Sequence, residues 1–264
     1  MKSLVKLGVA GALAVSGSMA AHAAIVAPTS SGNTGDLVLF ANVYTSAGTL
    51  INSYAGDTGI TVDSIGGGTQ PSGTFHDANL DTLLSEATGT AGTTTIWVLE
   101  GGWGHVSGGT FRPYLVSSSP SLTPIGGSQN GTKLNSWGLG LSSQITNING
   151  VITSGNSLLT TDNGQFGTGF NPFALAADVT NWYGNTASVA QTGLGTQTNV
   201  YRVTANSTAV ASVATITGIF KATLSSAGLS FQPFSAVPLP AAVWLLGSGL
   251  LGLAGVARRK VAAA

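Results

Sequence analysis

The chain contains no cysteine in its 264 residues. This absence excludes disulfide bonds, thiolate metal sites and thiol redox chemistry. It also excludes a lipid-modified amino-terminal cysteine. A chain of this length can bury a hydrophobic core without covalent cross-links. We therefore expect packing and hydrogen bonds alone to hold the fold together.

Charged residues are scarce, at 7% of the chain, and are unevenly placed. Five of the nine basic residues lie in the two terminal segments, so four remain in the central region against all nine acids, a formal balance of −5. Nucleic-acid binding needs clustered lysine and arginine against phosphate, so this balance excludes a nucleic-acid partner. The four central bases are Arg112, Lys133, Arg202 and Lys221.

The amino-terminal segment has the three-part layout of a secretory signal peptide. Two lysines precede a short apolar run, and small residues follow. Ala21 and Ala23 fit an A-x-A cleavage site, which leaves Ala24 as the first residue after a signal peptide of residues 1–23. The alternative is an uncleaved anchor, but the run is shorter than the about 20 apolar residues that a membrane span needs.

The carboxy-terminal segment has an uncharged, mostly apolar stretch over residues 241–257. As a helix it is about 26 Å long, or about 31 Å from Val237, against a hydrocarbon core of about 30 Å. Arg258, Arg259 and Lys260 follow at once. The positive-inside rule keeps such a cluster in the cytoplasm. We expect a transmembrane helix that stops translocation and leaves the rest of the chain outside the inner membrane.

The residues before this stretch predict an extended strip. Pro238 and Pro240 lack amide donors and favour extended neighbours. An extended segment just above a membrane is the shape that a protease or transpeptidase accepts. A plain single-pass anchor is the simpler interpretation of the apolar stretch alone.

The sequence VPLPAAVWLLGSGLLGLAGVARRK closely resembles the VPLPA-type variant of the PEP-CTERM sorting signal. The resemblance covers about a tenth of the chain. It implies processing by an exosortase, an integral-membrane enzyme of Gram-negative bacteria that make exopolysaccharide. The residues that carry the processing signal are Val237, Pro238, Leu239, Pro240 and Ala241, with Arg258, Arg259 and Lys260 as the basic end.

The central region predicts many short strands separated by turns rich in Gly, Ser and Asn. A change of period over residues 76–89 predicts one amphipathic helix, and residues 171–184 have the boundaries of a second. Residues 136–145 are expected to be a strand. We therefore expect a mainly β, antiparallel, β-sandwich-like single domain over residues 24–230 with one or two short helices. Residues 231–236 are expected to link it to the sorting signal.

His76, Asp77, Asp81 and Glu86 form one candidate cluster for chemistry. Asp77 and Asp81 are four residues apart and share a helix face, which could hold a metal beside His76. The ligand spacing matches no known metal motif, so the simpler interpretation is a helix-start charge at Asp77 and solvated acids elsewhere. We expect no metal and no cofactor.

His105 and Trp103 lie in GGWGHVSGG, which we expect to be a mobile hairpin loop. Hydrolase chemistry at His105 would need a serine nucleophile and an acid such as Glu100, but the sequence has no nucleophile elbow. Trp103 could present its ring to a sugar, although large aromatics more often pack in cores. Aromatic residues that could join it are Tyr114, Trp137, Trp182 and Tyr183.

From these observations we expect a non-enzymatic surface or extracellular-matrix protein, sorted by an exosortase and associated with exopolysaccharide or biofilm. A carbohydrate-binding module is the alternative, and a secreted hydrolase is the third. The domain would be held first at the periplasmic side of the inner membrane and then pass to the cell surface or matrix.

Overall fold

The computed structural model describes residues 24–27, 35–66, 70–107, 110–119, 131–161, 192–205 and 214–233. Three helices lie in these ranges: α1 (Val62–Gly66), α2 (Ala78–Gly89) and α3 (Gly131–Val151). The strands are β1 (Asp36–Tyr44), β2 (Leu50–Thr61), β3 (Gly73–Phe75), β4 (Thr94–Ser107), β5 (Thr110–Ser119), β6 (Ser157–Thr160), β7 (Thr192–Gly193), β8 (Gln197–Ala205), β9 (Ala214–Ser225) and β10 (Gly228–Pro233).

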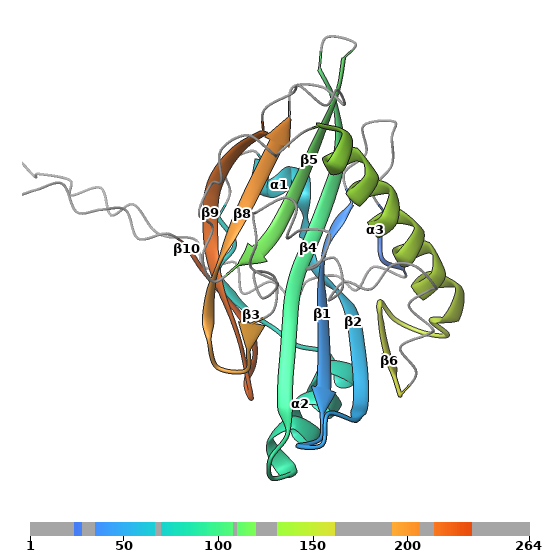
Figure 1. The fold of residues 1–264 in the computed structure, drawn as a ribbon, viewed down its shortest axis with the longest axis vertical. Helices are drawn as coiled ribbons and strands as arrows, with labels where there is room; N and C mark the ends of the chain where they lie inside the picture. Colours follow the sequence, from blue (N-terminus) through green and yellow to red (C-terminus); the bar gives the residue numbers. More distant parts are fainter. Residues whose placement is uncertain are drawn as a thin grey trace, which may run out of the picture. The chain divides into compact units, whose positions relative to one another are not determined.

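All ten strands belong to one sheet, in which every pairing is antiparallel. Its order is β3-β10-β9-β8-β5-β4-β1-β2-β6, with β7 paired to β4 (Figure 1). The prediction of a mainly β, antiparallel domain is confirmed. The expected sandwich of separate sheets is not found in the described ranges, because the hydrogen-bonded path is continuous. Instead the sheet curls, since α2 contacts both β2 near one end and β10 near the other.

The main hydrophobic core lies between the curled sheet and the short helices. Alternate residues of β1 and β4, such as Leu39 and Trp97, are buried there with Leu83 of α2 and Phe220 of β9. Such alternation is expected of strands, whose successive side chains point to opposite faces. This core therefore joins strands that lie far apart in the sheet order.

The other face of the central strands is buried as well. Val38, Phe40 and Val98 are fully buried but are not part of the main core. Helix α3 contacts β4 and β5, and its residues Leu141 and Ile145 are buried. The central strands thus have covered side chains on both faces, which explains the continuous apolar run at β1.

Helix α2 follows the sequence expectation closely. It starts after its N-cap Asp77 and ends at Gly89, and Leu80, Leu83 and Leu84 are buried. These leucines have the i, i+3, i+4 spacing of a core-facing stripe. The prediction of one amphipathic helix here is confirmed, while the helix expected over residues 171–184 lies outside the described residues.

Helix α3 corrects a second expectation. Residues 136–145 were expected to be a strand, but they lie inside a 21-residue helix. Leu141, Ile145 and Ile148 are buried and fall at i, i+4, i+7. This apolar stripe, packed on the sheet, outweighs the low helix propensity of Gly138 and Gly140.

The last strand sets the carboxy-terminal boundary of the domain. Strand β10 continues to Pro233, so three residues of the expected linker pair with β9. Phe231 is buried and meets Phe220 edge to face, with ring centroids 5.8 Å apart. The chain divides into two compact units after Pro233. None of the helices in the described ranges is long and apolar enough to cross a membrane.

Candidate functional site

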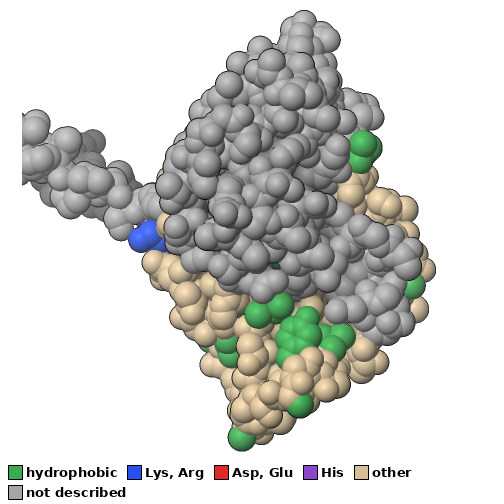
Figure 2. Space-filling view, in the orientation of Figure 1, with side chains coloured by type: hydrophobic (Ala, Val, Ile, Leu, Met, Phe, Trp, Pro, Cys, Tyr) green, Lys and Arg blue, Asp and Glu red, His purple; other side chains and the backbone are tan. Residues whose placement is uncertain are grey.

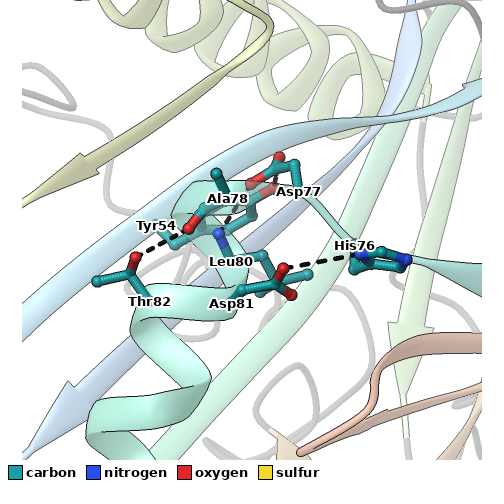
Figure 3. Close-up of polar contacts among 7 residues, drawn as sticks. All are labelled: Tyr54, His76, Asp77, Ala78, Leu80, Asp81 and Thr82. Atoms are coloured by element: carbon teal, nitrogen blue, oxygen red, sulfur yellow. Dashed lines mark hydrogen bonds and ion pairs between the residues drawn. The ribbon is translucent and has the colours of Figure 1, made fainter.

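The start of α2 brings the acidic candidate residues together with a buried tyrosine (Figure 3). The Asp77 carboxylate accepts the Leu80 amide at 2.8 Å, as an N-cap does, and accepts the Tyr54 hydroxyl at 2.7 Å. Both carboxylate oxygens therefore have protein donors. The simpler interpretation of Asp77, a residue that starts the helix, agrees with this geometry.

Tyr54 reaches Asp77 across the surface of β2. It is fully buried, and burial, followed by the nearby Asp77 charge, raises the pKa of its phenol well above the usual value. The ring lies over Gly56, where a Cβ atom would overlap the phenol group. Gly56 therefore supplies the space through which Tyr54 holds the helix, a role that the sequence did not reveal.

Further along α2, polar side chains tie the helix to its neighbours. Asn52 of β2 donates to Glu86 at 2.6 Å. Asn79 donates to the backbone carbonyl and the hydroxyl of Ser157 in β6, at 3.2 and 3.0 Å. Glu86 is thus engaged in anchoring the helix to β2.

His76 and Asp81 face each other at the exposed side of the helix. Their closest atoms, Nδ1 and Oδ2, are 3.7 Å apart, and the side chains are 63% and 59% exposed. A pair so open to water contributes little to stability. In the described residues, no group of three or more His, Asp or Glu side chains is placed to hold a metal ion. The α2 cluster is therefore best explained as helix anchoring.

The second candidate lies in the hairpin of β4 and β5. Trp103 and His105 belong to strand β4, so the expected mobile loop is wrong: only Gly108 and Gly109 separate the paired ends of the strands. Gly-Gly is typical of a two-residue hairpin connection. The register puts Trp103 opposite Tyr114 and His105 opposite Arg112.

This hairpin extends beyond its neighbours in the sheet. The pairing of β4 with β1 stops at Glu100, and the pairing of β5 with β8 stops at Tyr114. The residues nearer the turn pair only with each other among the described strands, as a two-stranded ribbon. Residues directly opposite in an antiparallel pair share a face. The register thus pairs two aromatic residues with each other, and a histidine with an arginine.

The side chain of Glu100, at the start of this ribbon, is buried. It is 1% exposed, and its Oε2 has no hydrogen-bond partner. Desolvation raises the pKa of this carboxyl well above its usual range. Gly101 beside it is tightly packed, since a Cβ there would meet Val62 and the backbone of β1. The hydrolase hypothesis needs an accessible acid near His105, and Glu100 does not provide one.

The expected mature amino terminus is attached to the domain. Ala24 is exposed, whereas Ile25 is 1% exposed. The Ile25 amide donates to Asn149 Oδ1 at 3.1 Å, and Asn149 Nδ2 donates to the Ile25 carbonyl at 2.7 Å. The Val26 amide donates to Asp36 Oδ2 at 2.6 Å. Within the described residues, the backbone just after the expected cleavage point is thus held to α3 and to the start of β1.

Several predicted residues fall outside the described ranges. These are Ala21 and Ala23 of the signal peptide, the aromatics Trp182 and Tyr183, and the sorting residues Val237, Pro238, Leu239, Pro240, Ala241, Arg258, Arg259 and Lys260. Trp137 lies in helix α3 and not in the β4–β5 hairpin.

Comparisons with protein-family models, curated proteins and solved structures found no match.

Proposed function

We propose that this chain is an exported, non-enzymatic protein of the cell surface or extracellular matrix, sorted by an exosortase. The nearly unbroken sorting pattern from Val237 to Lys260 carries the proposal. A signal peptide over residues 1–23 would direct export, and a transmembrane helix over residues 241–257 would hold the domain at the periplasmic side of the inner membrane. Cleavage near the VPLP segment would then release it to the surface or matrix of a Gram-negative bacterium.

Two features of the structure support this proposal. The division into units falls after Pro233, so the pattern begins four residues beyond the last strand and lies wholly in the second unit. At the other end, Ala24 is exposed and the next residue, Ile25, is buried and hydrogen-bonded to Asn149. Processing at both places would leave the described sheet intact.

Intact-mass analysis of the exported protein tests the proposal. We expect a mass that begins at Ala24 and lacks the Arg258–Lys260 cluster in wild-type cells. In a strain without the exosortase, or with Pro238→Ala and Pro240→Ala combined, the basic end should remain. Ser235→Ala, just before the pattern, is the matched control. A surface-displayed protein that still carries the basic cluster in wild-type cells would overturn the proposal.

A carbohydrate-binding module is the second candidate, favoured by the cross-strand register of Trp103 and Tyr114. Aromatic rings and polar groups on one face are the elements of a sugar site. We expect tryptophan fluorescence to change when polysaccharide is added, and Trp103→Ala to abolish this change. Trp97 is buried in the core, so its fluorescence should not change when polysaccharide is added. An unchanged response in Trp103→Ala would exclude the ribbon as the sugar site.

A further inference from the structure

The outward face of β8, β9 and β10 carries a continuous set of uncharged polar groups and one lysine. Residues that alternate with them, such as Val200, Phe220 and Phe231, are buried in the core. The register puts Asn199 opposite Lys221 and Lys221 opposite Gln232. We call this surface the amide face, and its residues are Gln197, Asn199, Tyr201, Lys221, Thr223 and Gln232.

Hydrogen bonds hold the polar groups of the amide face in place. Gln197 Nε2 donates to Gln232 Oε1 at 3.0 Å, which bridges β8 and β10 across β9. Asn199 Nδ2 donates to the Tyr201 hydroxyl at 3.0 Å. Gln197 and Gln232 are exposed, and Asn199, Tyr201 and Lys221 are half-buried. The face is therefore ordered before any ligand arrives, which lowers the entropy cost of binding.

The charge on this face is opposite to that of the central region as a whole. Seven acids lie between Asp36 and Glu100, but none lies in residues 192–233, which contain Arg202 and Lys221. No ion pair to Lys221 occurs among the described residues. In the view of Figure 2, the described surface shows one small basic group and no acidic side chain. An anionic group could thus approach Lys221 without repulsion from the same face.

We infer that the amide face binds an acidic polysaccharide. Amide groups and the Thr223 hydroxyl match the hydroxyl groups of a sugar, the Tyr201 ring can pack on a sugar ring, and Lys221 can pair with a carboxylate. A protein partner needs an apolar centre, which this set of residues lacks. A nucleic acid needs several clustered cations. The inference deepens the association with exopolysaccharide that the sequence predicts, and it rests on the proposed export to the cell surface.

The test measures binding of the purified exported protein to immobilised alginate, dextran and single-stranded DNA. Alginate is an acidic polysaccharide and dextran is a neutral one. DNA is an acidic polymer whose sugars carry no free hydroxyl groups within the chain. We expect alginate binding that weakens with salt, and weaker binding to dextran and DNA. Lys221→Gln should lower alginate affinity about three- to tenfold, which is the loss expected when one hydrogen bond of ordinary net strength is removed. Tyr201→Ala should lower affinity for both polysaccharides.

Arg202→Gln is the matched control. It removes one positive charge from β8, the strand next to that of Lys221, and strand alternation puts Arg202 on the face opposite to that of its neighbour Tyr201. We expect its alginate affinity to stay within about twofold of wild type. Thermal unfolding of each variant shows whether the fold is kept. Lys221→Arg keeps the positive charge, so it should retain binding if the loss in Lys221→Gln comes from the charge and not from misfolding.

Three results would overturn the inference: no alginate binding, DNA binding as tight as alginate binding, or equal losses in Lys221→Gln and Arg202→Gln. Each of these leaves the mass analysis of the tail unaffected. A protein that is cut at its VPLP segment but fails to bind alginate would therefore contradict this inference alone.

Discussion

At the scale of single residues, Glu100 shows how burial changes a carboxyl group. Its pKa is raised because the site excludes water and offers Oε2 no partner. The folded state therefore binds a proton more tightly than the unfolded state. This contribution to stability is fully present below the unfolded pKa of about 4.3 and is lost as pH rises through the folded pKa.

We expect Glu100→Gln to remove that pH dependence. The amide is uncharged at every pH, so the variant should match wild type near pH 4 and be more stable at pH 8, by about 1–3 kcal/mol. Urea unfolding at the two pH values measures the difference. Equal slopes of stability against pH in both proteins would show that Glu100 does not ionise in this range.

Gly56 is the second residue with a specific role. A Cβ atom at this position would push the Tyr54 ring away from Asp77. We expect Gly56→Ala to lower the free energy of unfolding by about 2–3 kcal/mol, from strain and a lost buried hydrogen bond. Gly89→Ala is the control, because a Cβ there meets nothing within 4 Å. A Gly56→Ala protein as stable as wild type would contradict this account of the contact.

At the scale of elements, the end of α3 fixes the amino-terminal segment. Asn149 makes two hydrogen bonds to the Ile25 backbone, as a strand neighbour would. We expect Asn149→Ala to cost about 1–2 kcal/mol and to speed trimming of the amino terminus by an aminopeptidase. Mass spectrometry over time follows the trimming. Asn147→Ala, on the exposed side of the same helix, should have no effect; similar trimming in both variants would argue against the anchor.

Helices α2 and α3 also show when a local sequence pattern is sufficient to predict a helix. Asp77, the leucine stripe and Gly89 lie within one short stretch, so α2 was predicted with its ends nearly correct. In α3 the apolar stripe was present, but Gly138 and Gly140 obscured it. Packing on the sheet supplies the stability that local propensity lacks.

At the scale of the whole molecule, β10 marks where the folded domain ends. A chain that stops after Pro233 keeps every described strand, whereas one that stops after Ser230 loses the buried Phe231. We expect the first to unfold like the full chain and the second to lose about 3–5 kcal/mol. Chemical denaturation of both compares them. Equal stability would place the boundary before Phe231, as the sequence had suggested.

The candidate sites were predictable only in part. The role of Asp77 as a helix-start residue follows from a short-range pattern. The position of Trp103 opposite Tyr114 and the assembly of the amide face depend on strand register. Register joins residues that are distant in the chain, and no local pattern encodes it.

By itself, the sequence determined the mainly β class, the position of α2 and the scarcity of charge, and it predicts export and sorting through its two ends. These properties rest on composition, periodicity and contiguous motifs, all of which act over a few residues. Only the tertiary structure decided that one curled sheet replaces two, that α3 is a helix and that the β4–β5 hairpin stands beyond its neighbours. Those outcomes depend on long-range pairing and burial, whose free energy appears only when the distant strands meet.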